Sequence, residues 1–358
     1  MQQREHLHGD LHAGGITIRQ YEAGDEFAIA AALDEEFQVG RTVDDWRWRF
    51  LEEPYDRAMA AVMVADGAIV GHVASSQYPV WIDGHRRWMG QGGDLVLKKE
   101  YRHRGILELL EELRVIYRYD TDVSMSFPVD RVVEIYRKRY PDIVTSRLPQ
   151  WVRWRSAEAV AAAAGRDVPR VVHPLADAAL AAARYAARRP AGGRTIAVCP
   201  EAGNEFDDLA ERSTRFAPCI RVRDREYVQW RWFDVPGGRW TVAAAHEGDR
   251  LTGWVAYGVS HFDAPGRGHV ADLLAGDHGT TRALLAFAAD ALEADGKVEV
   301  AFDCLDPRPW SRSAYYRAGF VPRGQGPNIM IRRTADDISH RARDLDNWYL
   351  TIGDSDLA

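Results

Sequence analysis

The chain has 358 residues, enough for two hydrophobic cores of about 150 residues each. Its net charge of −7 argues against the basic surface that nucleic-acid binding requires. The three cysteines, Cys199, Cys219 and Cys304, form no CxxC pair and no even set, which argues against a disulfide scaffold and a zinc knuckle. No apolar run of about 18 residues and no signal peptide is found, so we expect a soluble, cytoplasmic protein with no membrane span.

The first half of the chain predicts an α/β unit that follows a polar tail. Residues 1–15 are polar and rich in histidine, and we expect them to be disordered. The spacing of apolar residues then predicts a strand, a helix, three antiparallel strands, a helix, a strand, a helix and a closing strand. The Asp66-Gly67 dipeptide marks the first hairpin turn. These elements fall at residues 16–20, 26–37, 59–65, 68–79, 87–97, 105–119, 121–127, 129–139 and 143–155.

Four segments of the first half return in the second half, in the same order and at offsets between 179 and 184 residues. Such a series is hard to obtain by chance, so we predict a duplicated domain with copies at residues 16–155 and 195–335. The pairs are YEAGDEF at 21–27 with PEAGNEF at 200–206, Trp46-Arg47-Trp48 with Trp230-Arg231-Trp232, residues 69–74 with 251–256, and Tyr136 with Tyr315.

The second copy predicts the same order of elements after an initial strand and helix. Between the copies, residues 156–194 are rich in alanine and predict a helical linker, which either braces the two domains or acts as a spacer. Residues 336–358 are expected to form a tail beyond the second domain. The predicted elements of the second copy are at residues 195–199, 205–212, 240–245, 250–259, 268–275, 281–294, 298–304, 312–318 and 329–333.

The turn before the helix predicted at residues 105–119 has the composition of an anion-binding site. A helix N-terminus offers unpaired backbone N–H groups and a partial positive charge. Arg102 and Arg104 add charge-assisted hydrogen bonds, and Gly105 lets an anion approach the backbone without a Cβ in the way. Basic turns are common on protein surfaces, so the prediction depends on the place of this turn in the strand order.

This turn carries a resemblance to a known family. Arg102-His103-Arg104-Gly105-Ile106-Leu107 resembles the pyrophosphate loop, Q/R-x-x-G-x-G/A, of the GNAT superfamily of acyl-CoA-dependent N-acyltransferases, except that Leu107 replaces a small residue. Phe127-Pro128 and the helix that bears Tyr136 resemble the segments that follow in the family, and the second copy contains the YxxxGF pattern from Tyr315 to Phe320. The whole chain is therefore similar to tandem-GNAT acyltransferases. The resemblance implies two α/β (α+β) domains, each a mixed, mostly antiparallel sheet flanked by helices.

The second copy does not keep the loop. Thr280-Thr281-Arg282-Ala283 stands where the first copy has Arg102-His103-Arg104-Gly105, so the first arginine and the glycine are missing, and Asp277 adds a negative charge. We therefore predict that the N-terminal domain alone binds acyl-CoA.

The resemblance also implies roles for individual residues. In the family the pantetheine arm of CoA lies along the end of the fourth strand like an added strand. Tyr136 falls where the family has its general acid, and the alternative is that it is a packing aromatic. The implied cofactor-binding residues are Leu95, Val96, Leu97, Arg102, His103, Arg104, Gly105, Ile106, Leu107 and Phe127.

The general base stays open at this stage. Asp94, Glu100, His103 and Asp130 all lie near the inferred site, and we take Asp94 as the catalytic candidate beside Tyr136. However, its counterpart Asp272 persists in the copy without the loop, which favours a structural role for Asp94.

The leading hypothesis is an N-acyltransferase that moves an acetyl or longer group from acyl-CoA to an amine of a small molecule, sugar or natural product in a ternary complex. No metal is required, because the thioester already has a good leaving group. One alternative is an aminoacyl-tRNA-dependent peptidyltransferase of the tandem-GNAT type, which the acidic composition and the kept loop disfavour. The other is a non-catalytic acyl-CoA-binding protein. We expect a monomer or a homodimer.

Overall fold

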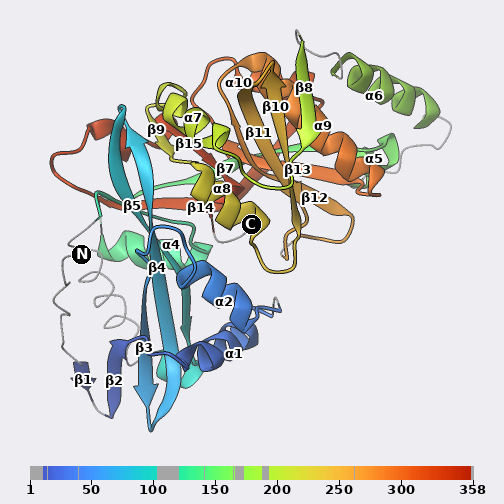
Figure 1. Cartoon of the computed structure of the whole chain (residues 1–358). Helices are drawn as coiled ribbons and strands as arrows, with labels where there is room; N and C mark the ends of the chain where they lie inside the picture. Colours follow the sequence, from blue (N-terminus) through green and yellow to red (C-terminus); the bar gives the residue numbers. More distant parts are fainter. Residues whose placement is uncertain are drawn as a thin grey trace. The chain divides into compact units, whose positions relative to one another are not determined.

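The computed structural model divides into two compact units (Figure 1). Unit 1 comprises Met1–Tyr78 and Trp88–Ser124, and unit 2 comprises Pro79–Arg87 and Met125–Ala358. Residues 125–155, which the repeat assigns to the first copy, therefore lie in unit 2. The structure describes residues 11–13, 15–38, 40–102, 121–140, 142–163, 165, 173–187, 193–261 and 263–355.

The sheet of unit 1 follows the order β1-β2-β3-β4-β5-β6, and its hairpins form where the sequence predicts them. Asp66 and Gly67 both have positive φ values, 50° and 76°, as the tight turn between β3 and β4 requires. Parts of β4, β5 and β6 belong to unit 2. The bounds are β1 (Leu11–Ala13), β2 (Ile16–Gln20), β3 (Met59–Ala65), β4 (Ala68–Ile82), β5 (His85–Leu97) and β6 (Val123–Ser126).

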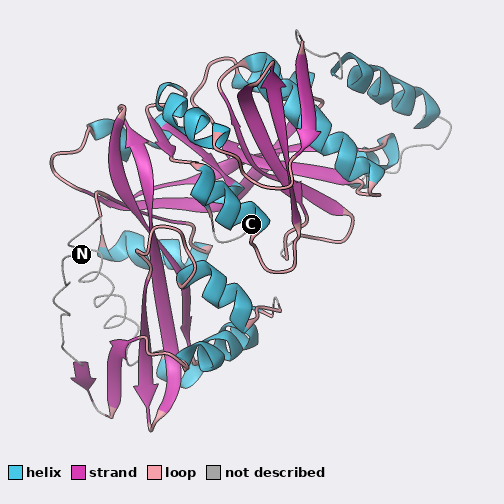
Figure 2. Cartoon of the chain, viewed as in Figure 1, coloured by secondary structure: helices cyan, strands magenta, loops and turns pink. Residues whose placement is uncertain are grey.

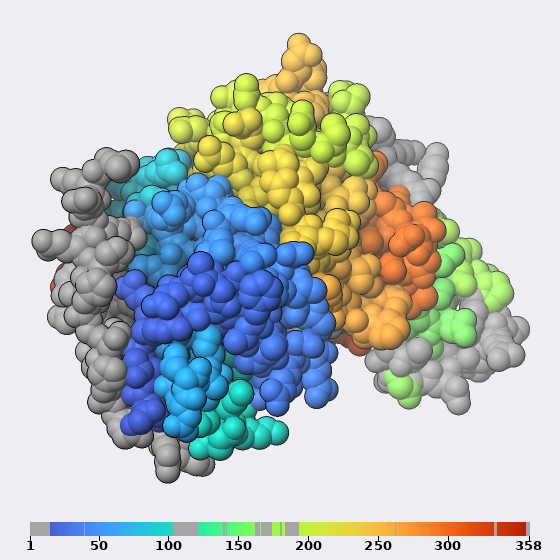
Figure 3. Space-filling view, turned by 60° about the horizontal axis from the view of Figure 1, so that its bottom comes forward, coloured from blue at the N-terminus to red at the C-terminus, as the bar shows by residue number. Residues whose placement is uncertain are grey.

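Helices α1 (Asp25–Phe37) and α2 (Val43–Phe50) pack on this sheet (Figure 2). Their buried side chains form one cluster with residues of β3, β4 and β5, and this cluster includes Leu33, Trp46 and Val96. Thr42 and Asp45 form a capping box that fixes the start of α2. In Figure 3 the residues coloured blue, which include both helices, form the visible face of unit 1. The predicted helix at 105–119 lies outside the described residues.

The sheet of unit 2 contains a strand that the repeat assigns to the other copy. Its order is β14-β7-β13-β12-β11-β10-β8, and β7 (Val144–Trp154) lies antiparallel to both β13 and β14. The other strands are β8 (Arg194–Val198), β9 (Cys219–Arg221), β10 (Trp240–Glu247), β11 (Arg250–Gly258), β12 (Arg267–Ala275), β13 (Glu299–Leu305), β14 (Val321–Thr334) and β15 (Trp348–Thr351).

The helices of unit 2 include both described parts of the predicted linker, α5 and α6, and α6 packs on α9 and α10. The α-helices are α4 (Asp130–Arg139), α5 (Ala157–Ala163), α6 (His173–Ala187), α7 (Glu205–Arg212), α8 (Arg225–Val228), α9 (His278–Ala294) and α10 (Ser311–Arg317). A π-helix, η4 (Gln229–Phe233), follows α8, and short 3-10 helices are η1 (Lys99–Tyr101) in unit 1 and η3 (Ser213–Arg215), η5 (His340–Arg343), η6 (Leu345–Asn347) and η7 (Ile352–Asp354) in unit 2. In the described part of the chain, no helix is long and apolar enough to cross a membrane.

The segment expected to be a tail is built into unit 2. β15 pairs antiparallel with β13 and parallel with β9, beside which it lies in Figure 1. Trp348, Tyr349 and Leu350 are buried, with at most 1% of each residue exposed. The last described residues are therefore part of the core of unit 2.

Candidate functional site

Asp94 lies in β5 and adopts a left-handed backbone conformation, with φ of 53°. Few residues other than glycine adopt this conformation, although aspartate tolerates it. Its buried carboxylate accepts hydrogen bonds from Arg41 Nη1 at 2.5 Å to both oxygens, and Arg49 Nη1 lies 3.4 Å from Oδ1. Burial raises the pKa of Asp94, but the charges of Arg41 and Arg49 oppose this effect and lower it below its usual value. Asp94 is therefore held as a carboxylate between two cations.

A buried histidine lies behind this ion-pair cluster. His72 in β4 is fully buried, and its Nε2 accepts a hydrogen bond from the Trp46 indole at 3.1 Å. Its Nδ1 lies 3.1 Å from the Ala61 carbonyl oxygen, to which it donates in the neutral tautomer. Burial lowers the pKa of His72 to about 4. The imidazole is therefore neutral near pH 7 and has no free lone pair with which to accept a proton from a ligand.

The end of β5 presents main-chain groups away from β4. Backbone groups alternate in direction along a strand. Lys98 N–H donates to Val70 O at 2.9 Å, and Val96 O faces Gly71, so even-numbered residues here point toward β4. It follows that the N–H and C=O groups of Leu95 and Leu97 point to the opposite side. A Cβ on Gly71 would lie 2.8 Å from Leu97 Cδ1, so this glycine permits the close strand packing.

Arg102 is fixed against the start of the turn by two hydrogen bonds. Its Nε donates to Leu97 O at 3.0 Å, and its Nη2 donates to Glu36 at the end of α1 at 2.5 Å. About a quarter of its side chain is exposed, so the guanidinium is accessible to a ligand. The remaining predicted loop residues, His103, Arg104, Gly105, Ile106 and Leu107, lie outside the described residues.

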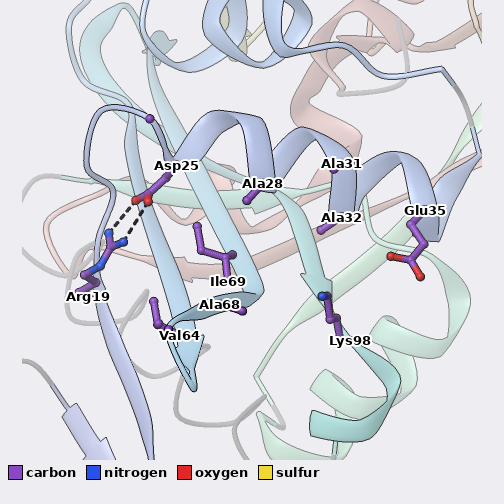
Figure 4. A pocket seen from close by; sticks show the side chains of 12 residues that line it. Arg19, Asp25, Ala28, Ala31, Ala32, Glu35, Val64, Ala68, Ile69 and Lys98 are labelled. Atoms are coloured by element: carbon purple, nitrogen blue, oxygen red, sulfur yellow. Dashed lines mark hydrogen bonds and ion pairs between the residues drawn. The ribbon is translucent and has the colours of Figure 1, made fainter.

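A pocket of about 450 Å³ lies between α1 and the β3–β4 hairpin of unit 1. Its wall contains the small side chains of Ala28, Ala31 and Ala32 on α1, and the close-up shows the Arg19–Asp25 ion pair at one end and Glu35 and Lys98 at the other (Figure 4). Lys98 directly follows the strand end at Leu97, so the pocket adjoins the predicted cofactor strand. Sequence analysis did not find this pocket, because it forms between residues far apart along the chain.

Two predicted site residues lie in unit 2. Tyr136 on α4 is 7% exposed, and its ring stacks on Tyr140 with centroids 5.6 Å apart. The Arg332 guanidinium lies 5.8 Å from the Tyr136 ring centroid. Phe127 is buried just before α4. Thus the structure brings Asp94, Leu95, Val96, Leu97 and Arg102 together in unit 1, whereas Tyr136 and Phe127 belong to unit 2.

In the second copy, the helix that follows β12 starts earlier than the sequence predicted. Helix α9 begins at His278, three residues before the predicted start at Thr281. The earlier start comes from Asp277, whose side chain caps the helix by accepting a hydrogen bond from Thr280 N–H at 2.9 Å. The residues aligned with the cofactor loop are therefore part of the first turns of a helix. The sequence contains this signal, because Asp277 and Thr280 have the spacing of an N-cap interaction.

Sequence analysis also missed the arginines that bind Asp94. A signal for Arg41 is present, because it directly precedes Thr42, the N-cap residue of α2, and Arg223 directly precedes Asp224, the N-cap residue of α8. Arg223 Nε donates to Asp272 Oδ2 at 2.9 Å. The repeat thus contains a second conserved feature, an arginine before the N-cap that binds the aspartate of the corresponding strand.

No family model and no curated protein matches this sequence. Solved structures do match. A GCN5-related N-acetyltransferase from Kribbella flavida has a TM-score of 0.57 at 17% identity and covers 88% of this chain and 70% of its own. Saccharomyces cerevisiae N-myristoyltransferase with bound myristoyl-CoA has a TM-score of 0.55 at 10% identity and covers 92% and 88%. The fold is that of the GCN5-related N-acetyltransferases (GNAT).

A third match agrees with this assignment. The GCN5-related N-acetyltransferase from Anabaena variabilis has a TM-score of 0.58 at 11% identity and covers 88% of this chain and 72% of its own. All three matches extend over at least 88% of this chain.

Proposed function

We propose that this chain is an acyl-CoA-dependent N-acyltransferase with its cofactor site in unit 1. The observation that carries the proposal is the end of β5, where the main-chain groups of Leu95 and Leu97 point away from β4 and the strand leads directly to Arg102. In a GNAT fold, this edge receives the pantetheine arm as an added strand, and the following basic turn receives the diphosphate.

The proposed reaction requires the protein to place the two reactants and to stabilise the charge that develops on the thioester oxygen. The acceptor is an amine on a small molecule, sugar or natural product, and its neutral nitrogen attacks the thioester carbonyl. A main-chain N–H of Leu95 or Leu97 stabilises the developing oxyanion, because it is fixed in the strand and needs no reorganisation. The family resemblance assigns protonation of the departing thiolate to the phenol of Tyr136, which belongs to unit 2.

Asp94 contributes by position in this proposal. A carboxylate that two guanidinium groups bind, and whose pKa they lower, is a poor acceptor for a substrate proton. The same ion pairs hold Asp94 in the left-handed conformation from which residues 95–97 continue. We therefore assign Asp94 as a positioning residue for the cofactor strand. Water, or a group that lines the site of the amine substrate, then removes the proton from the ammonium.

Calorimetric titration of the full chain with CoA and acetyl-CoA tests the proposal. We expect saturable binding, and we expect Arg102→Ala to weaken it about tenfold because a charge-assisted hydrogen bond to phosphate is lost. Arg86→Ala, at an exposed position near the start of β5, is the control and should bind as the unsubstituted protein does. The proposal fails if the unsubstituted protein does not bind CoA or if both variants bind equally well.

A further inference from the structure

Strands β12 and β13 of unit 2 pair for only part of their length. Residues 267–269 pair in parallel with residues 299–301. Further along, Cys304 and Leu305 of β13 pair instead with Thr351 and Leu350 of β15. The two strands thus diverge, and the C-terminal segment of the chain, residues 348–355, supplies the strand that β13 lacks.

Side chains of unit 2 bind the carbonyl groups of β12 that point away from β11. Leu274 O faces Gly253 of β11, so the carbonyl groups of Leu273 and Ala275 point to the other side, toward the divergence. The Tyr349 hydroxyl donates to Leu273 O, and Arg308 Nη1 donates to Ala275 O. The carbonyl groups of Leu273 and Ala275 therefore each accept a hydrogen bond from a side chain of unit 2.

A buried charge cluster anchors the segment. Asp354 Oδ2 accepts a hydrogen bond from Arg223 at 2.7 Å, and Arg221 lies 3.2 Å from Oδ1. Arg223 also binds Asp272 on β12, and Thr351 Oγ1 donates to Asp272 at 2.9 Å. Asp354, Arg223 and Asp272 are each fully buried, so removal of any one leaves an uncompensated charge away from water.

The segment approaches β12 as closely as glycine allows. A Cβ on Gly353 would lie 2.8 Å from the Trp232 ring and 2.9 Å from Ala271 O. Arg231 Nη2 donates to Ser355 O at 2.8 Å, which binds the main chain from the opposite side. Main-chain pairing, a charged anchor and a site that excludes a Cβ are the features of a bound peptide strand.

The N-terminus of α9, the helix that follows β12, is also unsuited to binding an anion. Asp277 caps the N-terminus of α9 through hydrogen bonds from the N–H and hydroxyl groups of Thr280, at 2.9 and 2.6 Å. Burial raises the pKa of Asp277, but the hydrogen bonds from Thr280 outweigh this effect and lower it. The carboxylate is charged near pH 7, so it occupies the N–H groups and repels a second anion.

We propose that β12 and β13 form a strand-accepting groove in unit 2 and that the ligand of this groove is the chain's own segment 348–355. The segment fills the groove permanently and closes unit 2 to any other extended ligand. One consequence rests on the proposed function: the place that acyl-CoA takes in unit 1 is filled in unit 2 by residues 348–355 and Asp277, so each chain binds one CoA.

The test cuts the folded full chain and asks whether the segment stays bound. A protease site placed between Asp336 and Asp337, at an exposed turn, allows cleavage after folding. We expect the C-terminal fragment to co-elute with the rest of the chain and to leave only when unit 2 unfolds. If the fragment dissociates while near-ultraviolet circular dichroism of the remainder is unchanged, the segment is peripheral and the inference is overturned.

Matched variants refine the test. Gly353→Ala and Asp354→Ala, each in the cleavable chain, should speed fragment dissociation at least about tenfold, because they remove the close approach and the charged anchor. Asp346→Ala, at an exposed position of the same fragment, is the control and should have no effect. If a variant does not fold, fragment retention by the unsubstituted chain still decides the question.

The CoA stoichiometry separates this inference from the proposed function. Binding of no CoA by the full chain contradicts the proposed function and leaves the fragment experiment unaffected. Binding of two equivalents contradicts the closure of unit 2. The proposed function and the closure of unit 2 together predict one equivalent of bound CoA per chain, and the loss of this binding in Arg102→Ala.

Discussion

Asp94 receives short hydrogen bonds to both carboxylate oxygens from one nitrogen of Arg41, at 2.5 Å. Arg41 directly precedes the N-cap of α2, and in unit 2 Arg223, which directly precedes the N-cap of α8, binds Asp272 in the same way. The two copies therefore share a device that ties the start of a helix to the strand equivalent to β5. Because the same ion pair is present in the copy that lacks the predicted cofactor loop, we infer that it stabilises the fold.

Substitution of Asp94 separates the positioning role from a role as general base. Asp94→Asn removes the buried negative charge that Arg41 and Arg49 bind, so we expect the free energy of unfolding to fall by about 3 kcal/mol in urea titrations. In the double variant Arg41→Met with Asp94→Asn, the loss should be smaller than the sum of the single losses. A variant of normal stability that loses the acidic limb of the pH–kcat profile would instead identify Asp94 as the base.

Tyr136→Phe tests the proton donor. The substitution removes one hydroxyl and keeps the stacked ring, so we expect kcat to fall about 100-fold, as for loss of a general acid, with the Kd for CoA unchanged. Thiol release from acetyl-CoA measures the rate. Tyr140→Phe, which changes the stacking partner by the same atom, is the control and should keep its activity. Equal losses in both variants would favour a packing role for Tyr136.

Local pattern predicted most elements of the fold because their causes are local. The strand at 16–20 and the hairpin around Asp66-Gly67 agree with β2 and with the β3–β4 turn, since alternation and positive φ are properties of neighbouring residues. The placement of β7 in the sheet of unit 2 is different. Alternation indicates which face of a strand is buried, but not which strands lie beside it.

The candidate site shows the same division. A strand end followed by a basic turn is a local pattern, and the family resemblance then implied the roles of residues 94–97 and Arg102. The sequence did not indicate Arg41, which contacts Asp94 only in the folded chain, or His72, whose charge affects the pKa of Asp94. It also assigned residues 348–355 to a tail, because a short apolar segment gives no sign of the strands with which it pairs, β13 and β9.

Arg153 tests whether β7 is an integral part of unit 2. This buried arginine of β7 donates to Glu293 at 3.0 Å and to Asp290 at 2.5 Å, both on α9. Arg153→Ala removes a buried cation that Glu293 and Asp290 both bind, so we expect a loss of about 3 kcal/mol in the free energy of unfolding, measured with urea. Arg155→Ala, at an exposed position two residues away, should change stability little. Equal stability of both variants would contradict this assignment.

His72 predicts the acid response of unit 1. Burial lowers its pKa in the folded state to about 4 from 6.5, so the folded state resists protonation. The unfolded chain binds the extra proton, and stability therefore falls as the pH drops from about 6.5 toward 4. His72→Asn should flatten this decline in urea midpoints measured across the range, although its stability at pH 7 will be lower. His85→Asn, at the exposed first residue of β5, should leave the decline unchanged.

His269 predicts the opposite response in unit 2. The imidazole is buried between Asp263 and Asp303, at 2.7 and 2.8 Å. Burial lowers its pKa, but the hydrogen bonds that the imidazole donates to both carboxylates outweigh this effect and raise it to about 9. The resulting stability is complete below about 6.5, the unfolded value, and is lost as the pH rises through 9.

The loss is bounded by the size of the pKa shift, which corresponds to about 3 kcal/mol. Urea midpoints of unit 2 at several values between pH 6 and 10 measure it. His269→Asn should remove the dependence on pH between 6.5 and 9, whereas His340→Asn, at an exposed position, should retain it. If the unsubstituted protein shows no decline above pH 6.5, His269 is neutral in the folded state and the prediction is wrong.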